Sequence, residues 1–183
     1  MAALAACLGI SMSIMVCEIT AGKKTGGELE KRAEELAILA RKTMSRLKEL
    51  LAADMEQFNK YMSALKLPKE TGEEKARRAA ALSDALKGAT QVPLEIARTC
   101  LEGLMLNAEV CETGKKSVLS DAGVAALLLE AALKAALLNV DANLPYLDDG
   151  EFAALAAKER DELAARAIKL KEGSLDTVRR RMG

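Results

Sequence analysis

The sequence contains no histidine and no tryptophan among its 183 residues, and only two phenylalanines and two tyrosines. Without histidine the chain cannot build a Ser-His-Asp or Cys-His catalytic centre, a histidine-ligated zinc site or histidine acid–base chemistry. Any catalysis must therefore use carboxylates, lysine, tyrosine, cysteine or main-chain dipoles. The shortage of aromatic side chains also leaves few surfaces on which nucleic-acid bases could stack.

Net charge and cysteine motifs are lacking as well. Lysine plus arginine and aspartate plus glutamate number 27 each, so no net field favours nucleic acid or an anionic membrane as a partner. The four cysteines have no C-x-x-C spacing and lie in apolar runs: Cys7, Cys17, Cys100 and Cys111. We expect buried small hydrophobic side chains rather than a four-thiolate metal site. No disulfide framework is indicated, which favours a reducing compartment.

The N-terminal run MAALAACLGISMSIMVCE is apolar over about the length of a signal peptide. No lysine or arginine precedes its apolar part, and the run ends at Glu18, short of the roughly 20 apolar residues that a membrane span needs. We interpret it as a buried core helix, and therefore expect a cytoplasmic protein that is not inserted in a membrane.

Alanine, leucine, glutamate and lysine dominate the rest, with only three prolines, which is a helical composition. Between residues 28 and 66, eleven apolar residues recur every three or four positions, at the helical period of about 3.6. Further helices are expected over 2–20, 72–89, the segment around Pro93, 120–144 and 151–172, with a kink or break at Pro93. The sequence predicts one all-α domain over residues 1–183, an up-and-down bundle of about six helices.

Several helix ends have recognisable caps. Thr71 followed by Glu74 fits a capping box, and Ser120 and Asp148 are candidate N-caps for the last two helices. The final segment GSLDTVRRRMG is expected to fray.

The segment 119–145 carries polar groups on two sides. Its charged side chains gather on one side of the helical wheel and predict the solvent face: Glu130, Lys134 and Asp141. Asp121, Asn139 and Asn143 then point toward the packed side, where polar groups must be paired or functional. The alternative is that Asp121 complements the helix dipole and the asparagines bond to the backbone.

Asp121 and Asn139 share one helix face but lie about 27 Å apart along the axis at about 1.5 Å per residue. Both can serve one small site only if two copies of the helix run antiparallel across a two-fold axis. If the two residues act together, this geometry places the site at the subunit interface of a homodimer.

The motifs LPKET after DMEQFNKYM, then ATQVPLEIA, then SDAGVAALL and LNVDANL occur in an order that resembles the cyclodeaminase/cyclohydrolase family of folate enzymes. The resemblance extends from the first residues through about Phe152. It implies an all-helical dimer that binds folate between its subunits, with a tetrahydrofolate derivative as the substrate and no prosthetic group or metal.

The family's motifs map onto individual positions. Its S-D pair falls on Ser120 and Asp121, and Asp121 is the expected catalytic residue. The expected substrate-binding residues are Ser120, Asn139, Asn143, Asp54, Lys23, Lys24, Lys69, Lys115 and Lys116. The lysines are candidates for the glutamate carboxylates of folate, with ordinary surface charge as the alternative. Asp54 either reaches inward or lies at the boundary of an amphipathic helix.

The sequence departs from the family at three places. The chain begins with Met1 where the family's N-terminal helix and P-G-G-G-S loop should come first, so we expect that part to be missing. The loop GKKSVLSD lacks the usual asparagine, and the tyrosine that often follows the lysine pair is absent.

The resemblance implies one of two reactions: conversion of 5-formiminotetrahydrofolate to 5,10-methenyltetrahydrofolate with loss of ammonia, or interconversion of the 5,10-methenyl and 10-formyl compounds. Both place positive charge near C5 and N10, which one fixed carboxylate could stabilise. Nothing in the sequence resolves the leaving group, although cyclodeaminase chemistry is slightly favoured. The alternative from another class is a non-catalytic helical dimerisation module, a truncated or decayed relative.

Overall fold

The computed structural model describes residues 1–22 and 27–183. Five α-helices account for most of this chain: α1 Ala2–Ala21, α2 Glu28–Leu65, α3 Gly72–Thr113, α4 Leu119–Asn143 and α5 Gly150–Met182. Two short 3-10 turns, η1 Lys116–Val118 and η2 Leu144–Tyr146, flank α4. The described ranges contain no strand, so the predicted all-α class is confirmed.

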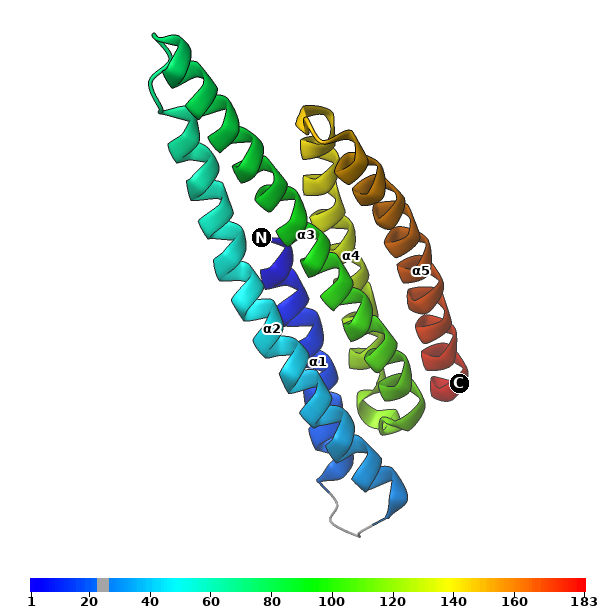
Figure 1. Cartoon of the computed structure of the whole chain (residues 1–183). Helices are drawn as coiled ribbons and strands as arrows, with labels where there is room; N and C mark the ends of the chain where they lie inside the picture. The colour runs from blue at the N-terminus through cyan, green and yellow to red at the C-terminus, as the bar shows by residue number, and fades with distance from the viewer. Residues whose placement is uncertain (23–26) are drawn as a thin grey trace.

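The helices alternate in direction along the chain, as the predicted up-and-down bundle requires (Figure 1). α4 packs against α1, α3 and α5, while α2 packs against α1 and α3. The C-terminal part of α2 and the N-terminal part of α3 extend together past the other helices (Figure 1). We call residues 60–85 the arm.

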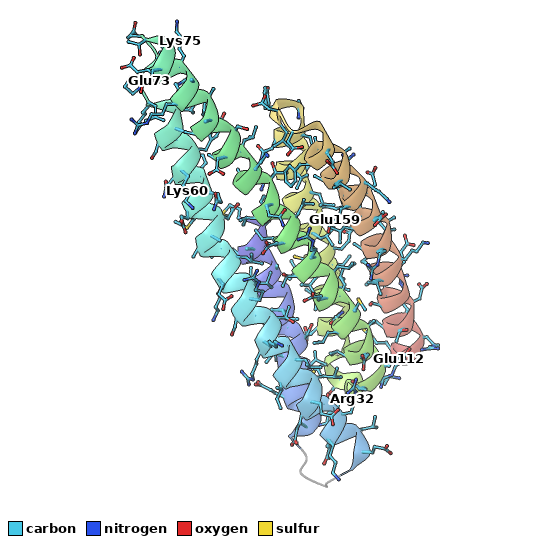
Figure 2. All side chains as sticks on the ribbon, in the orientation of Figure 1. Arg32, Lys60, Glu73, Lys75, Glu112 and Glu159 are labelled. Carbon is cyan, nitrogen blue, oxygen red and sulfur yellow. The ribbon has the colours of Figure 1, made fainter. Side chains whose placement is uncertain are left out.

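The predicted stripe of apolar residues on α2 is only partly buried. Its central members are in the core, for example Leu36 and Leu47, whereas Met62 and Leu65 on the arm are exposed. They are exposed because the helices other than α3 end before the arm begins. Figure 2 shows Glu73 and Lys75 at the tip of the arm, with Arg32 and Glu112 near the opposite end of the molecule.

The helix count is five rather than about six because α3 continues through Pro93. Proline has no N–H, so it leaves the carbonyl four residues earlier without its helical partner. That carbonyl belongs to Ala89, and the side-chain Nδ2 of Asn143 on α4 donates to it at 2.9 Å. A neighbouring helix thus supplies the missing hydrogen bond, and the predicted break does not occur.

The predicted caps are confirmed in one case and wrong in two. The Thr71 hydroxyl accepts from the Glu74 amide at 3.2 Å, and the Glu74 carboxylate accepts from the Thr71 amide at 3.0 Å. The main-chain amide of Glu70 also donates to the Glu74 carboxylate, at 2.9 Å. The hydrogen bonds from the Thr71 and Glu70 amides lower the pKa of Glu74. The N-cap of α5 is Asp149, not Asp148, because the Asp149 carboxylate accepts from the Phe152 amide at 3.0 Å.

Ser120 is not the cap of α4, since α4 begins one residue earlier at Leu119 and has no side-chain cap hydrogen bond. The predicted fraying after residue 172 is also wrong. α5 remains helical to Met182 because its last turns contact α3: Arg180 pairs with Glu112, and Arg181 donates to two main-chain carbonyls.

The core brings helices close together where glycine leaves room. Leu129 of α4 is fully buried and packs between Gly9 of α1 and Gly103 of α3. A Cβ on Gly9 would lie 2.9 Å from Leu129 Cγ, and one on Gly103 would lie 3.2 Å from Leu129 Cδ2. α1, α3 and α4 can therefore approach closely around one leucine.

A buried polar group ties the same three helices together. The Asn107 carbonyl oxygen accepts from the Ser13 hydroxyl at 2.8 Å, and its amide donates to the Ala122 carbonyl at 2.9 Å. Because Asn107 is fully buried, these partners replace the water that its side chain has lost.

The predicted solvent face of α4 is wrong. Glu130 is only 9% exposed and pairs with Lys134, while Asp141 pairs with Arg160 of α5. The charged side of α4 therefore borders α5, and the ion pairs make its burial tolerable.

The exposed side of α4 is instead apolar. Exposed apolar side chains also lie on α1, which packs against α4. We call this surface the α1–α4 face, made up of Leu4, Leu8, Ile19, Val124, Leu127, Ala131 and Leu138. Leu8 is 58% and Leu138 66% exposed, which is unusual for leucines on neighbouring helices.

Two segments are long and apolar enough to cross a bilayer by length and composition alone, Ala2–Ala21 and Lys116–Tyr146. Just over half of each apolar window, 56%, is buried against other helices. Core helices of a bundle have this property, in agreement with the interpretation of the N-terminal run as a core helix.

Candidate functional site

A cleft of about 540 Å³ opens where α4 ends beside α2 and α3. It is lined by residues from three helices and η2, and most of its lining area is apolar. The polar lining side chains are Asp54, Gln57, Asn59, Tyr61, Asn139, Asn143 and Tyr146. An apolar cleft with a few convergent polar groups is the usual form of a small-molecule site.

The helical period explains how α2 contributes its side of the cleft. Gln57 and Phe58 each lie three or four residues from both Asp54 and Tyr61, so the four side chains share one face of α2. Gln57 lies against Gly88 of α3, where an added Cβ would be 2.3 Å from the Gln57 side-chain oxygen. The glycine thus leaves the space that the Gln57 amide occupies.

α4 contributes its last turn. Asn143 is half-buried, and its side-chain nitrogen donates a hydrogen bond to Ala89 O. One of the two alternatives from the sequence was that this asparagine bonds to the backbone, and its amide nitrogen does so. Asn139, one turn earlier, is exposed and lies at the edge of the α1–α4 face. The helical wheel predicted that Asn139 points toward the packed side, and this prediction is wrong.

The structure therefore brings together three of the predicted site residues, Asp54, Asn139 and Asn143, in one cleft. They come from segments about 85 residues apart in the chain. Asp54 is half-buried, between the two alternatives that its sequence position allowed.

A second group of predicted residues lies at the other end of α4. Ser120 and Asp121 are in its first turn, and Lys115 and Lys116 are in the turn before it. Asp121 is half-buried and, like Asn139, borders the exposed apolar stripe of α4. Since α4 is continuous between them, the separation of about 27 Å holds, and within one chain Asp121 does not reach the cleft.

The remaining lysines are elsewhere. Lys69 lies in the turn at the tip of the arm and does not line the cleft. Lys23 and Lys24 lie outside the described residues. Five lysines were expected near the folate carboxylates, and the structure describes three of them. Of these three, Lys115 and Lys116 lie next to Asp121 and Lys69 does not.

The turn before α4 is held by α1. The Lys115 amide donates to the Thr20 hydroxyl at 3.1 Å, and the Lys115 ammonium donates to the Ile19 carbonyl. Thr20 is buried and its hydroxyl donates back to the Val16 carbonyl at 2.7 Å. The C-terminal turn of α1 thus fixes the main chain that leads to Asp121.

The cysteines were predicted to be buried side chains, and three of the four are buried. Cys17, Cys100 and Cys111 are buried, Cys7 is half-buried, and all four thiols are free. Burial raises the pKa of Cys100 to about 12 and those of Cys17 and Cys111 to about 11, so these thiols stay protonated at neutral pH. Within residues 1–22 and 27–183, no three Cys, Asp or Glu side chains cluster as metal ligands would.

Four polar residues of the cleft were not predicted: Gln57, Asn59, Tyr61 and Tyr146. Gln57 and Tyr61 could have been found, because they follow Asp54 at helical spacing. Tyr146 could not, since its position depends on how η2 turns after α4.

Comparison with known proteins gives consistent results. The family model described as formiminotransferase-cyclodeaminase matches residues 1–162. The chain is 42% identical over 178 residues to a methenyltetrahydrofolate cyclohydrolase of Methylorubrum extorquens, covering 97% of this chain and 86% of that protein.

Two further similarities concern cyclodeaminases. A formimidoyltransferase-cyclodeaminase of Mus musculus is 36% identical over 151 residues, and the match covers 82% of this chain but 28% of that longer protein. The crystal structure of a formiminotetrahydrofolate cyclodeaminase from Thermotoga maritima matches with a TM-score of 0.84 at 25% identity, over 97% of this chain and 85% of that one.

Proposed function

Because the chain belongs to the formiminotransferase-cyclodeaminase family, we propose that it is a cytoplasmic folate one-carbon enzyme that hydrates 5,10-methenyltetrahydrofolate to 10-formyltetrahydrofolate. The observation that carries this proposal is the convergence of three separate motif residues, Asp54, Asn139 and Asn143, on one apolar cleft. The similarity to the cyclohydrolase over 86% of its length favours hydration as the reaction. The folate derivative is the substrate and no prosthetic group is involved.

The second candidate reaction is cyclodeamination of 5-formiminotetrahydrofolate. It is favoured by the similarity to the mouse and Thermotoga maritima proteins, whose names include that activity. The two reactions share a bridging one-carbon unit and differ in the group that leaves.

The proposed chemistry needs one carboxylate. In hydration, water adds to the cationic methenyl carbon, the C–N5 bond breaks and a proton is released, which leaves the formyl group on N10. Asp121 would stabilise the cationic substrate and orient the attacking water. The polar cleft residues would bind the pterin ring, with Asp54 accepting from its ring N–H and amino groups.

Within one chain Asp121 is too far from the cleft, so the proposal requires a homodimer. The α1–α4 face supplies a reason for one, because it is apolar and exposed along the stripe between Asp121 and Asn139. An antiparallel pairing of two such faces buries both stripes and brings the partner subunit's Asp121 beside the cleft. Each dimer then has two sites, each at the subunit interface.

The same pairing places positive charge near the site. Lys115 and Lys116 directly precede Asp121 and would come with it to the partner's cleft. There they would receive the glutamate carboxylates of the folate. Ser120 would contribute its hydroxyl from the same turn. The proposal also includes Lys23, Lys24 and Lys69 as binding residues, although Lys69 does not line the cleft.

The experiment that tests this proposal follows the absorbance of 5,10-methenyltetrahydrofolate in the presence of the purified protein. Wild type, Asp121→Asn and the control Asp161→Asn are compared; Asp161 is an exposed carboxylate of α5. Loss of the methenyl compound that is slowed about 100-fold in Asp121→Asn and unchanged in the control supports the proposal.

5-Formiminotetrahydrofolate is supplied in a second assay. Formation of the methenyl compound from it, without hydration, makes the protein a cyclodeaminase. If neither reaction occurs in a folded dimer, the enzyme proposal is wrong and a non-catalytic helical dimerisation module takes its place.

A further inference from the structure

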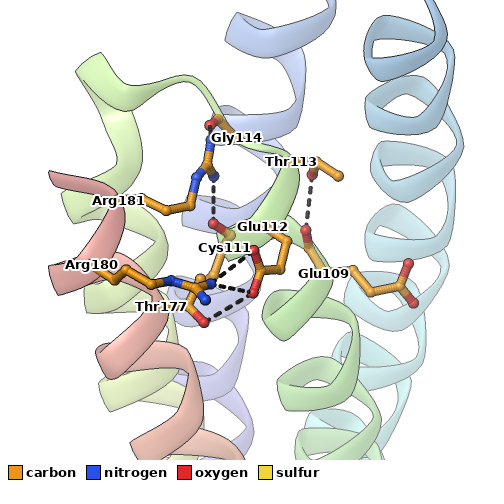
Figure 3. Close-up of polar contacts among 8 residues, drawn as sticks. All are labelled: Glu109, Cys111, Glu112, Thr113, Gly114, Thr177, Arg180 and Arg181. Carbon is orange, nitrogen blue, oxygen red and sulfur yellow. Dashed lines mark hydrogen bonds and ion pairs between the residues drawn. The ribbon is translucent and has the colours of Figure 1, made fainter.

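The last part of α5 lies beyond the region that the family model matches, which ends at residue 162. It nevertheless returns to the turn between α3 and α4, directly before Ser120 and Asp121. Figure 3 shows Arg180 and Arg181 of α5 reaching α3 and this turn. The contacts of Arg181 are the more consequential.

Arg181 donates to two main-chain carbonyls at the end of α3. Its Nη1 donates to Cys111 O at 2.6 Å and its Nη2 to Gly114 O at 2.9 Å (Figure 3). The last carbonyls of a helix have no partner within the helix, and a cation there also complements the helix dipole. The planar guanidinium donates to the two carbonyls through two different nitrogens in a fixed fork, whereas an ammonium would have to reach both with a single nitrogen.

The opposite side of the turn leaves no room for adjustment. Gly114 is buried, and an added Cβ would lie 2.8 Å from Val16 Cγ1 of α1 and 2.9 Å from Val110 O. The next residue, Lys115, is bonded to Thr20. The turn is therefore held between the C-terminal end of α1 and the C-terminal end of α5.

The first turn of α4 has no cap of its own, because the residue before it, Val118, cannot accept a side-chain hydrogen bond. Only the short η1 segment separates the held turn from α4. The position of Asp121 thus depends on how Gly114 and Lys115 are fixed.

We propose that Arg181 is a positioning residue, which fixes the turn at Gly114 and through it sets the place of the Asp121 carboxylate. The proposal rests on the function proposed above, in which Asp121 acts on the substrate. Arg181 itself does not line the cleft.

The test compares Arg181→Ala with Arg179→Ala. Arg179 lies in the same last turn but is 73% exposed and pairs only with Asp176, so it is a matched control. Hydrogen exchange of the main-chain amides of residues 115–121 is measured together with kcat and KM of the full-length protein. Arg181→Ala should speed this exchange about tenfold and lower kcat about tenfold with KM changed less than about threefold, because a misplaced catalytic group affects the chemical step most.

Arg179→Ala should leave exchange and kcat within about twofold of wild type. Arg181→Lys keeps the charge but lacks the two-nitrogen fork of the guanidinium, so its kcat should lie between those of wild type and Arg181→Ala. It also serves as the test if Arg181→Ala does not fold.

Unaltered exchange at residues 115–121 in Arg181→Ala, or a kcat equal to wild type in the folded variant, overturns the proposal. A merely structural role would lower the thermal midpoint and leave kcat per folded molecule unchanged. Asp121→Asn in the same assay tests the proposed function separately, because full activity of this variant refutes the catalytic role of Asp121. The hydrogen exchange of residues 115–121 in Arg181→Ala tests the role of Arg181 independently of that result.

Discussion

Asn143 donates its side-chain amide to the carbonyl of Ala89, the one main-chain acceptor that Pro93 deprives of its helical partner. The two residues are 54 positions apart and belong to α4 and α3. One hydrogen bond therefore keeps α3 continuous, joins it to α4 and fixes one wall of the cleft.

Replacing Asn143 by alanine should destabilise the protein by about 1–3 kcal/mol, since Ala89 O would lose its partner in a half-buried place. Urea unfolding measures the loss. Pro93→Ala restores the main-chain N–H, so the double variant Asn143→Ala/Pro93→Ala should lose less than the single asparagine variant. Equal losses in both backgrounds would contradict this account of the bond.

Two glycine-to-alanine substitutions should have opposite effects. Gly9→Ala places a methyl group 2.9 Å from Leu129 Cγ and should cost about 1–3 kcal/mol through overpacking of the core. Gly173→Ala on α5 meets nothing within 4 Å and should stabilise by about 0.4–1 kcal/mol because alanine favours the helix. Thermal or urea unfolding of the pair checks both signs.

The ion pair between Glu159 and Arg98 should make stability depend on acid pH. The hydrogen bond from Arg98 Nη2, at 2.7 Å, lowers the pKa of Glu159 in the folded protein. A carboxyl whose pKa is lower when folded stabilises the protein above its unfolded pKa, about 4.3, and this contribution is lost as the pH falls through the folded value.

Glu159→Gln should therefore be less stable than wild type at pH 7, and the difference should shrink steadily below about pH 4. The control Glu162→Gln, a more exposed carboxylate on the same helix, should show little difference at either pH. A constant difference between Glu159→Gln and wild type down to pH 2 would mean that the charge is not responsible.

The exposed apolar stripe of α4 predicts the assembly state. Ala131 lies midway along this stripe, and Ala131→Glu would bury a charge in the proposed dimer interface. Light scattering should give twice the 19.5 kDa chain mass for wild type and the single chain mass for the variant. A monomeric wild type at micromolar concentration would refute the interface and, with it, the shared site.

Two inactive variants should restore activity when mixed. If Asp121 and Asn139 of one site come from different subunits, unfolding and refolding Asp121→Asn together with Asn139→Ala makes half of the dimers mixed. Each mixed dimer has one fully wild-type site, so about a quarter of wild-type activity is expected. Activity no higher than that of the separate variants would show that the two residues do not complete one another's site.

The helices and their approximate ends were predictable because the apolar residues repeat at the helical period and Thr71 and Glu74 form a local capping pair. The errors came from contacts between distant segments. A kink or a break was expected at Pro93, and the break does not occur; the sequence does not show that Asn143 would supply the missing donor. Arg180 and Arg181 were expected to fray because their acceptors on α3 lie about 70 residues away.

The candidate site shows the same division. The resemblance selected Asp54, Asn139 and Asn143, which do line one cleft, but the helical wheel assigned the wrong face of α4 to solvent. Charged side chains normally mark the solvent face, but here Glu130 is buried beside Lys134, and Asp141 is only partly exposed and pairs with Arg160 of α5. The face that remained exposed is apolar, which only the packing of α3 and α5 could show.

The packing of α1 on α4 also bears on how the protein is made. α1 leaves the ribosome before α4, and the leucine that fills the space at Gly9 is Leu129, about 120 residues later in the chain. At roughly 5–20 residues per second, this helix waits on the order of 6 to 24 seconds for its packing partner. During that time its apolar surface is open to chaperones and to other nascent chains, so the yield of folded protein should respond to chaperone supply.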